Sequence, residues 1–485
     1  MKQLLPTIAA LLLCASAIGQ GIDDAMLYSQ TQYHGTAKSL GMGNALGAVG
    51  GDMTAVCINP AGLGLYRSNE FTATLNLLDN LHQSSYYGET NHANKLRLTI
   101  PNIGYVNAKQ RSNYRALRFT QFGIGLTRTN EFNYRTFAKG INPTSSMIDS
   151  YLAQIDGYNP NELQEAFPNT IFPAWNTYLI DIYQDSQGDY YDSPVPQGGI
   201  WQGRESDFKG RAEEWTFAGS ANYADRLFLG ISIGLGHIKR KGIRELEESL
   251  PSNSDIDTDF KQWNFTENIS STGWGGNIKV GFIYHANNWL RFGAAFHSPT
   301  IYAFEESWQT ETESHIKNDT YKSISPEAHY EYTFISPLKW VSSLAFVVGQ
   351  EAIVSLDVEY TNYGAARFRA DDYDYGSTNE GIKDALGRTA NFRLGAEWRI
   401  GSSYLRAGAA YCGSPFGLGN ASSSMKKASV GISLPLSSDT SIDFAYELTH
   451  GKIFTYLYDA GELGIEPITH SQFRNNLALT LKARW

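Results

Sequence analysis

Residues 352–360 read AIVSLDVEY, and this stretch decides the fold class. Apolar side chains occupy the even positions from Ala352 to Tyr360, while Ser355, Asp357 and Glu359 stand at odd positions. A period of two is typical of a β-strand whose two faces meet different surroundings. The same alternation recurs at residues 390–399 and 441–448, so the chain is predicted to be all-β.

The lengths of the connections distinguish a membrane barrel from a soluble sandwich. Tight connections are expected at Ala224-Asp225, His285 to Asn288, Gly349-Gln350, Gly401-Ser402 and Ser437 to Asp439. Long connections alternate with them, at residues 136–211, 241–263, 300–336, 364–388 and 458–471. Short turns at one end and long loops at the other are typical of a transmembrane antiparallel β-barrel.

Counting back from the C-terminus gives about fourteen strands, an even number as bacterial barrels have. In the last strand, Phe473, Leu477, Leu481 and Trp485 share one face, and the basic residues stand on the other. An unpaired charge facing lipid costs about 2 to 4 kcal/mol at midplane, so the basic residues are predicted to point into the lumen. A terminal aromatic residue also suits recognition by the outer-membrane assembly machinery.

Composition excludes several other classes of protein. The chain has 485 residues, only 18% of them charged, and a net charge of -10, which provides no basic surface for nucleic acid. No apolar run beyond the N-terminus is long enough for a membrane helix. Cys57 and Cys412 stand far apart without zinc-site spacing, so we expect no disulfide, metal site or cofactor.

Residues 1–20 have the order of a secretory signal peptide, with Lys2, an apolar stretch and a small-residue segment before Gln20. A lipoprotein signal at Cys14 is the alternative, but Leu13 is bulky where such signals place a small residue. Together with the barrel pattern, the leader predicts the outer membrane of a Gram-negative bacterium.

Residues 21–68 are rich in glycine and show little strand alternation. The Gly41-x-Gly43 pattern resembles a phosphate-binding loop, but no strand precedes it and no βαβ unit follows. Close backbone packing inside a narrow tube is the better interpretation, since glycine permits tight approach. Asn59-Pro60-Ala61 ends the segment shortly before the first strand, and Pro60 cannot donate to a strand ladder.

This segment resembles the N-terminal hatch of the FadL-type transporters of long-chain fatty acids and other hydrophobic compounds, which carries an Asn-Pro-Ala motif. The resemblance implies a hatch at residues 21–68, with Asn59, Pro60 and Ala61 inside a 14-stranded barrel at residues 69–485. It continues through the strands, in these segments: 274–277, Gly281, 292–293, 297–299, 357–363, 394–398, 406–411 and 414–415. His297 stands where the family often has Arg, and Tyr360 and Tyr363 stand where it has Trp.

The Gly50-Gly51-Asp52 stretch and the long second outside loop resemble the branch of this family found in Bacteroidetes-type bacteria. The resemblance implies a monomer that takes up hydrophobic molecules passively, by loop capture, transfer above the hatch and lateral exit through the wall. Alternatives are a type IX secretion-associated component, a haem transporter and a lipase or protease built into the barrel. His297 and Ser298 are adjacent in a strand and face opposite sides, which argues against a catalytic dyad.

A lateral exit needs a locally disrupted strand, and glycine-rich or bulged stretches are where ladders break. The third strand shifts its alternation near Gly123, so Phe122, Gly123 and Gly125 are the candidate gate. The alternative is that these glycines accommodate a neighbouring segment. The 136–211 loop carries apolar residues at near-helical spacing, which predicts either a collecting surface for ligand or an internally packed cap.

Asp357, Glu359, Arg393 and Arg399 are predicted to face the lumen from adjacent strands. Their mixed signs favour ion pairs that brace the interior. Capture of a ligand carboxylate by Arg393 or Arg399 is the alternative, since charge-assisted hydrogen bonds to carboxylates are strong.

Overall fold

A computed structural model describes residues 21–111, 116–186, 188–252, 254–417, 423–458 and 464–485. The predicted signal peptide at residues 1–20 and Cys14 lie outside this range. Within it, no helix is long and apolar enough to cross a membrane.

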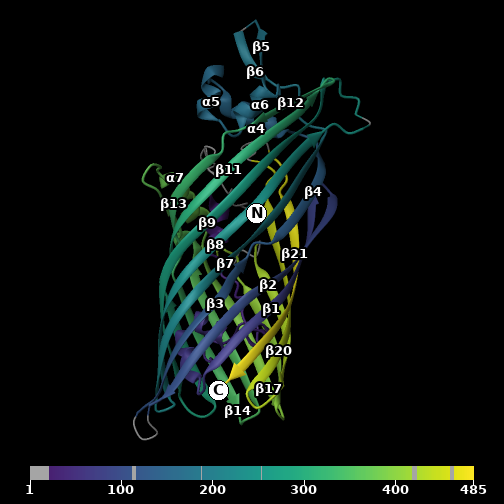
Figure 1. Ribbon diagram of the computed structural model, residues 1–485. Coiled ribbons are helices and arrows are strands. Elements are labelled where there is room, and N and C mark those ends of the chain that lie inside the picture. Colours follow the sequence, from purple (N-terminus) through teal and green to yellow (C-terminus); the bar gives the residue numbers. More distant parts are fainter. Residues whose placement is uncertain (1–20, 112–115, 187, 253, 418–422, 459–463) are drawn as a thin grey trace, which may run out of the picture.

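Fourteen antiparallel strands pair in a closed ring, as the alternation predicted (Figure 1). In ring order they are β1 (Glu70–Tyr86), β2 (Glu89–Gln110), β3 (Leu117–Glu131), β7 (Ile200–Tyr223), β8 (Leu227–Ser249), β9 (Phe260–His285), β10 (Leu290–His297), β14 (Lys339–Val348), β15 (Ala352–Asn362), β17 (Arg388–Ile400), β18 (Ser403–Cys412), β19 (Met425–Pro435), β20 (Thr440–Thr455) and β21 (Ile468–Arg484). The ring closes where β1 pairs with β21, from Glu70↔Arg484 to Ser85↔Thr469.

The two faces of the wall follow the predicted alternation. In β15, Leu356 is 38% exposed toward the lipid side, whereas Asp357 is fully buried toward the lumen. The short turns also lie where they were predicted, for example between β14 and β15 and between β17 and β18. Residues 224–226 join β7 to β8, and Ala224 and Asp225, both with positive φ, are the central residues of a turn closed by a hydrogen bond from Arg226 N to the carbonyl oxygen of Tyr223 (3.0 Å). Positive φ at both central residues suits the twist of a hairpin.

The long connections are shorter than predicted, because paired strands occupy large parts of them. Both ends of the predicted 136–211 loop are strands, namely β4 (Tyr134–Asn142) and the first part of β7, and these two strands pair with each other. The predicted 300–336 loop consists largely of β11 (Ile301–Ile316), β12 (Asp319–Ile324) and β13 (Ala328–Ile335). The 364–388 connection contains η3 (Tyr363–Ala365), β16 (Arg367–Arg369) and α7 (Gly376–Ala385).

The remaining 143–199 segment folds as a cap at the end opposite the C-terminus (Figure 1). It contains α4 (Met147–Ile155), η2 (Pro160–Glu162), α5 (Leu163–Ala166), α6 (Ile171–Asn176) and the hairpin of β5 (Asp181–Asp185) and β6 (Gly188–Asp192). Ile148, Tyr151 and Ile155 are buried in one apolar cluster with the upper barrel wall, which confirms an internally packed cap. Glu248 of β8 fixes the start of α4 by accepting hydrogen bonds from Ser146 Oγ (2.5 Å) and Met147 N (2.8 Å).

The N-terminal segment lies within the barrel, and we call residues 21–66 the hatch segment (Figure 1). It consists of α1 (Ile22–Ser29), α2 (Ala37–Gly41), α3 (Met53–Ile58) and η1 (Pro60–Leu65). Thr36, Asp52 and Asn59 each cap the helix that follows through a side-chain oxygen. The segment contacts opposite sides of the wall: Gly47 N donates to Asp357 Oδ2 (2.8 Å), and Ala37 N donates to Thr480 Oγ1 (2.7 Å).

The wall has one prominent interruption, between β2 and the strands that follow it. The β2–β3 ladder runs from Gln110↔Phe119 to Asn102↔Thr127 and then stops. Above it, β2 pairs only with β1, and β4 pairs only with β7. Pro101 stands at this point, opposite a register shift between Thr74 and Asn76, and a proline cannot donate to a ladder.

Candidate functional site

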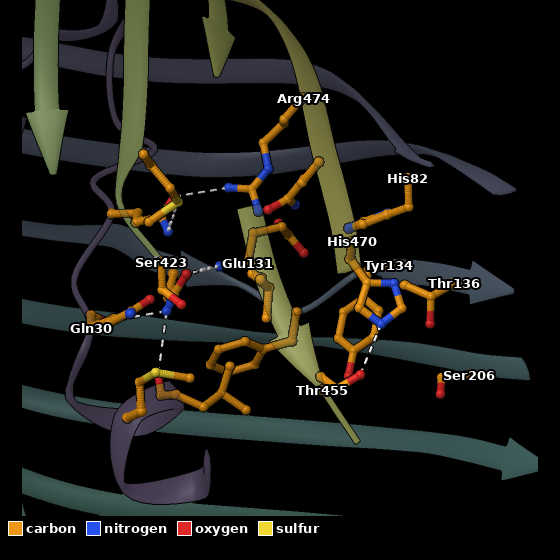
Figure 2. Close-up of a pocket in the computed structure, with 18 of the residues that line it drawn as sticks. Gln30, His82, Glu131, Tyr134, Thr136, Ser206, Ser423, Thr455, His470 and Arg474 are labelled. Atoms are coloured by element: carbon orange, nitrogen blue, oxygen red, sulfur yellow. Dashed lines mark hydrogen bonds between the residues drawn. The ribbon is translucent and has the colours of Figure 1, made fainter. Parts of the chain in front are cut away.

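A cavity of about 200 Å³ lies inside the barrel between α1 and the wall (Figure 2). It is formed by α1 and the chain after it, β1, the β3–β4 junction, β7, β8 and the C-terminal strands. Its lining is Met26, Leu27, Gln30, Gln32, His82, Asn130, Glu131, Phe132, Tyr134, Thr136, Arg204, Ser206, Arg244, Ser423, Met425, Ile453, Thr455, His470, Gln472 and Arg474. Polar and charged side chains make up most of this lining, and Met26, Leu27, Phe132, Met425 and Ile453 contribute apolar surface. A cavity that combines apolar surface with convergent polar groups can hold a small molecule.

Arg474 of β21 is one of the charged groups in this cavity, and it is only 5% exposed. Its Nε donates to Asn80 Oδ1 (2.8 Å) and its Nη1 to Gln32 Oε1 (3.1 Å). No carboxylate of the described residues lies within 4.0 Å of the guanidinium. Neutral partners therefore hold Arg474, and its positive charge is not cancelled by an ion pair.

Arg204 of β7 is in the same situation at the upper end of the cavity. Its Nη1 donates to the carbonyl oxygen of Tyr456 (2.6 Å), and its Nη2 donates to Thr455 Oγ1 (2.5 Å). Among the residues that the structure describes, it too has no ion-pair partner. By contrast, Arg244 beside it is paired with Glu267 at 3.0 Å.

A second cavity, of about 240 Å³, lies beneath the cap and shares Arg204 and Arg244 with the first. Its other lining residues are mostly apolar or aromatic: Met147, Ser150, Tyr151, Gln154, Phe167, Thr170, Leu246, Phe265, Glu267, Trp308, Leu457 and Tyr458. The two cavities thus meet at a pair of arginines, one ion-paired and one not.

α1 separates the inner cavity from an aromatic cluster that contains Tyr28, Phe304 and Phe334. Asp24 anchors this helix through an ion pair with Arg240 at 3.1 Å. Burial raises the pKa of the Asp24 carboxyl to about 7, against the attraction of Arg240.

The three residues of the Asn-Pro-Ala motif lie at the start of η1, against β8 and β9. Asn59 Nδ2 donates to the carbonyl oxygens of Gly47 (2.8 Å) and Phe282 (3.0 Å), and Asn59 Oδ1 accepts from Ala61 N (3.1 Å). Pro60 and Ala61 pack on Gly230 of β8, where a Cβ atom would lie 2.3 Å from the Pro60 carbonyl carbon. The motif therefore joins the hatch segment to itself and to the wall.

The predicted wall break at Gly123 is not where the ladder is interrupted. Gly123 pairs with Val106 on one side and Ala218 on the other, so both ladders are continuous there. A Cβ atom at Gly123 would contact Leu63, and one at Gly125 would lie 2.5 Å from Met53 Cε, so these glycines make room for the hatch segment. Phe122 faces outward and is 51% exposed. A role of the three residues in ligand passage stays a prediction, while the ladder break lies at Thr127.

Three of the four predicted luminal charges lie together, below the cavity. Arg393 Nη2 is 2.8 Å from Glu359 Oε2, and both side chains are buried. Asp357 accepts from the hatch segment at Gly47. Arg399 lies apart, exposed near the β17–β18 turn, where its Nε donates to the carbonyl oxygen of Gly401 (3.0 Å). None of the four lines the inner cavity, which favours bracing over ligand capture.

No family model matches the sequence, and no curated protein matches it. Among solved structures, a Pseudomonas aeruginosa FadL homologue matches 94% of this chain and 99% of its own, at 12% identity and a TM-score of 0.60. The Pseudomonas putida toluene transporter TodX matches 93% of this chain and 98% of its own, at 14% identity and a TM-score of 0.53. The Ralstonia pickettii toluene transporter TbuX gives the same coverage and identity, with a TM-score of 0.52.

The fold is that of the FadL barrels. At this level of identity the likeness concerns the fold, and it extends over nearly the whole of both chains. The described residues contain no group of three or more His, Cys, Asp or Glu side chains that could hold a metal ion.

Proposed function

We propose that this protein is an outer-membrane transporter for hydrophobic molecules that carry an anionic end, such as long-chain fatty acids. The observation that carries the proposal is the pair of adjoining cavities that meet at Arg204, beside the interruption in the wall. The FadL fold supports it, since the similar structures include a FadL homologue and two toluene transporters.

The route follows from the order of the elements. The apolar cavity beneath the cap receives the ligand, and the inner cavity holds it above the hatch segment. Phe132 and Tyr134 of the β3–β4 junction line that cavity and follow Thr127, where the β2–β3 ladder ends, along the chain. A hydrophobic ligand can therefore leave sideways into the membrane, where its apolar surface stays out of water.

The test of the proposal is uptake. A long-chain fatty acid should enter cells that express this protein and lack their own transporter, and detergent-purified protein should retain such molecules in mass spectrometry. Absence of both uptake and retained amphiphiles would contradict the proposed function.

Replacing Arg204 by glutamine should weaken the binding of a long-chain acid while sparing its methyl ester. A charge-assisted hydrogen bond is worth about 1.5 to 3 kcal/mol, which corresponds to about a 10- to 150-fold loss of affinity for the acid. Titration of both ligands against the purified barrel measures the difference.

Two variants control this measurement. Lys239→Gln removes a positive charge from the outer face and should change neither affinity, while Arg204→Lys should keep part of the preference for the acid. Equal losses for acid and ester in Arg204→Gln would show that Arg204 only supports the loop at Tyr456.

A further inference from the structure

The upper halves of β2 and β4 are two neighbouring strand edges without a ladder between them. β4 crosses the luminal side of β1: the buried Asn80 donates to the carbonyl oxygen of Asn133 (2.6 Å), and the His82 ring stands beside the Tyr134 ring at 6.1 Å. On the other side of the hairpin, Leu98 of β2 is 66% exposed. The upper β1–β2 hairpin therefore covers β4 from outside, and we call the space between them the slot.

Two side chains of β2 cross the slot. Lys95 Nζ donates to the Asp207 carboxylate and to the carbonyl oxygen of Phe208 (2.6 Å), both on β7. Asn91 Nδ2 donates to the carbonyl oxygen of Lys139 on β4 (3.3 Å). The Lys95 side chain is 12% exposed, so it lies in the slot and not in solvent, while its partner Asp207 is 47% exposed.

We propose that Lys95 and Asp207 form a latch that holds the slot closed, and that breaking this ion pair opens the lateral exit. The proposal rests on the proposed function, because the slot serves a purpose only if ligand leaves through it. It adds the residues that control the exit, which neither the fold nor the cavities assign.

The energy of this contact suits a latch. A full β-ladder between β2 and β4 would hold the edges with a row of backbone hydrogen bonds. These bonds would have to break together before the two edges could part. Partly exposed ion pairs are weak, so thermal motion breaks them readily. Pro101 and the register shift opposite it stand at the base of the free edge, and bulges let a strand bend locally.

The first test compares release rates in matched variants. Lys95→Gln and Asp207→Asn should each raise the rate at which reconstituted protein releases a fluorescent long-chain acid into vesicle lipid, by up to about fivefold. The reversed pair, Lys95→Asp with Asp207→Lys, should return the rate toward the parental value.

The controls stand on the same strands and faces. Arg97 lies two residues from Lys95 and has no carboxylate within 4.0 Å among the described residues, so Arg97→Gln should leave the rate unchanged. Glu205 pairs with Arg135 and not across the slot, so Glu205→Gln should also be silent. Equal effects of Lys95→Gln and Arg97→Gln would overturn the latch in favour of a general charge effect.

The second test locks the slot. With Cys412 replaced by serine, Lys95→Cys and Asp207→Cys are joined by a short reducible bifunctional thiol reagent, since Cys57 is buried. Release should fall on joining and recover on reduction, while binding of the acid stays at the parental level. Parental protein that binds or moves no acid contradicts the proposed function itself. If the joined variant transports the acid at the parental rate, the latch is wrong, although the proposed function still stands.

Discussion

Replacing Gly230 by valine is expected to displace the hatch segment and open the barrel to small hydrophilic solutes. A Cβ atom at Gly230 would lie 2.3 Å from the Pro60 carbonyl carbon and 2.4 Å from Ala61 N. These are backbone atoms, so no side-chain rotation relieves the clash. Overpacking of this kind costs about 1 to 3 kcal/mol, which shifts the balance between seated and displaced hatch about 5- to 150-fold.

Conductance of the purified barrel in a planar bilayer measures this opening. Gly219→Val is the matched control, because Gly219 lies on the neighbouring strand β7 and a Cβ atom there would meet nothing within 4 Å. The control should conduct like the parental protein. If Gly230→Val remains as closed as Gly219→Val, residues 59–61 do not seal the lumen.

Which residues face the lipid and which face the lumen could be predicted from the sequence, since contact with lipid requires apolar side chains on one face of each strand. Leu356 and Asp357 are neighbours with opposite surroundings, and the contrast is visible in their side chains alone. The positions of the short turns are equally local, because three residues, Ala224 to Arg226, suffice to join the paired strands β7 and β8.

The strand ends could not be predicted in the same way. β7, β8 and β9 are 24, 23 and 26 residues long, whereas about 9 to 11 residues of a strand cross a membrane. Beyond the membrane no lipid enforces alternation, so residues 200–210 resemble a loop in sequence although they pair with β4 and β8.

The wall break and the cavity depend on register, which no single strand reveals. Gly123 disturbs the alternation as a gate would, but its missing side chain makes room for Leu63. Arg204 lies opposite Ala138 and Leu246, whereas Arg406 lies opposite Glu397. The signal that separates an arginine without an ion-pair partner from a bracing one is therefore the cross-strand neighbour, and it requires the pairing to be known.

Replacing Arg393 by glutamine should lower the heat stability of the barrel strongly and leave ligand affinity unchanged. The substitution removes the guanidinium that lies 2.8 Å from Glu359, whose side chain is 1% exposed. Breaking a buried ion pair costs about 3 to 5 kcal/mol, because one charge stays buried without its partner. Arg393 does not line the cavity, so an acid and its methyl ester should bind as they do to the parental protein.

The heat-dependent mobility shift of the folded barrel on gels measures this loss, and two variants define its cause. Arg399→Gln alters an exposed side chain, for which changes of about 0.5 kcal/mol or less are usual, so it should melt with the parental protein. Removing Glu359 as well, in Arg393→Gln with Glu359→Gln, eliminates the unpaired buried charge and should restore much of the stability. Bracing is the whole role of Arg393 only if the double variant regains heat stability and both variants bind the acid as the parental protein does. Selective loss of the acid in Arg393→Gln would instead assign ligand capture to this arginine, below the cavity in which Arg204 and Arg474 stand without carboxylate partners among the described residues.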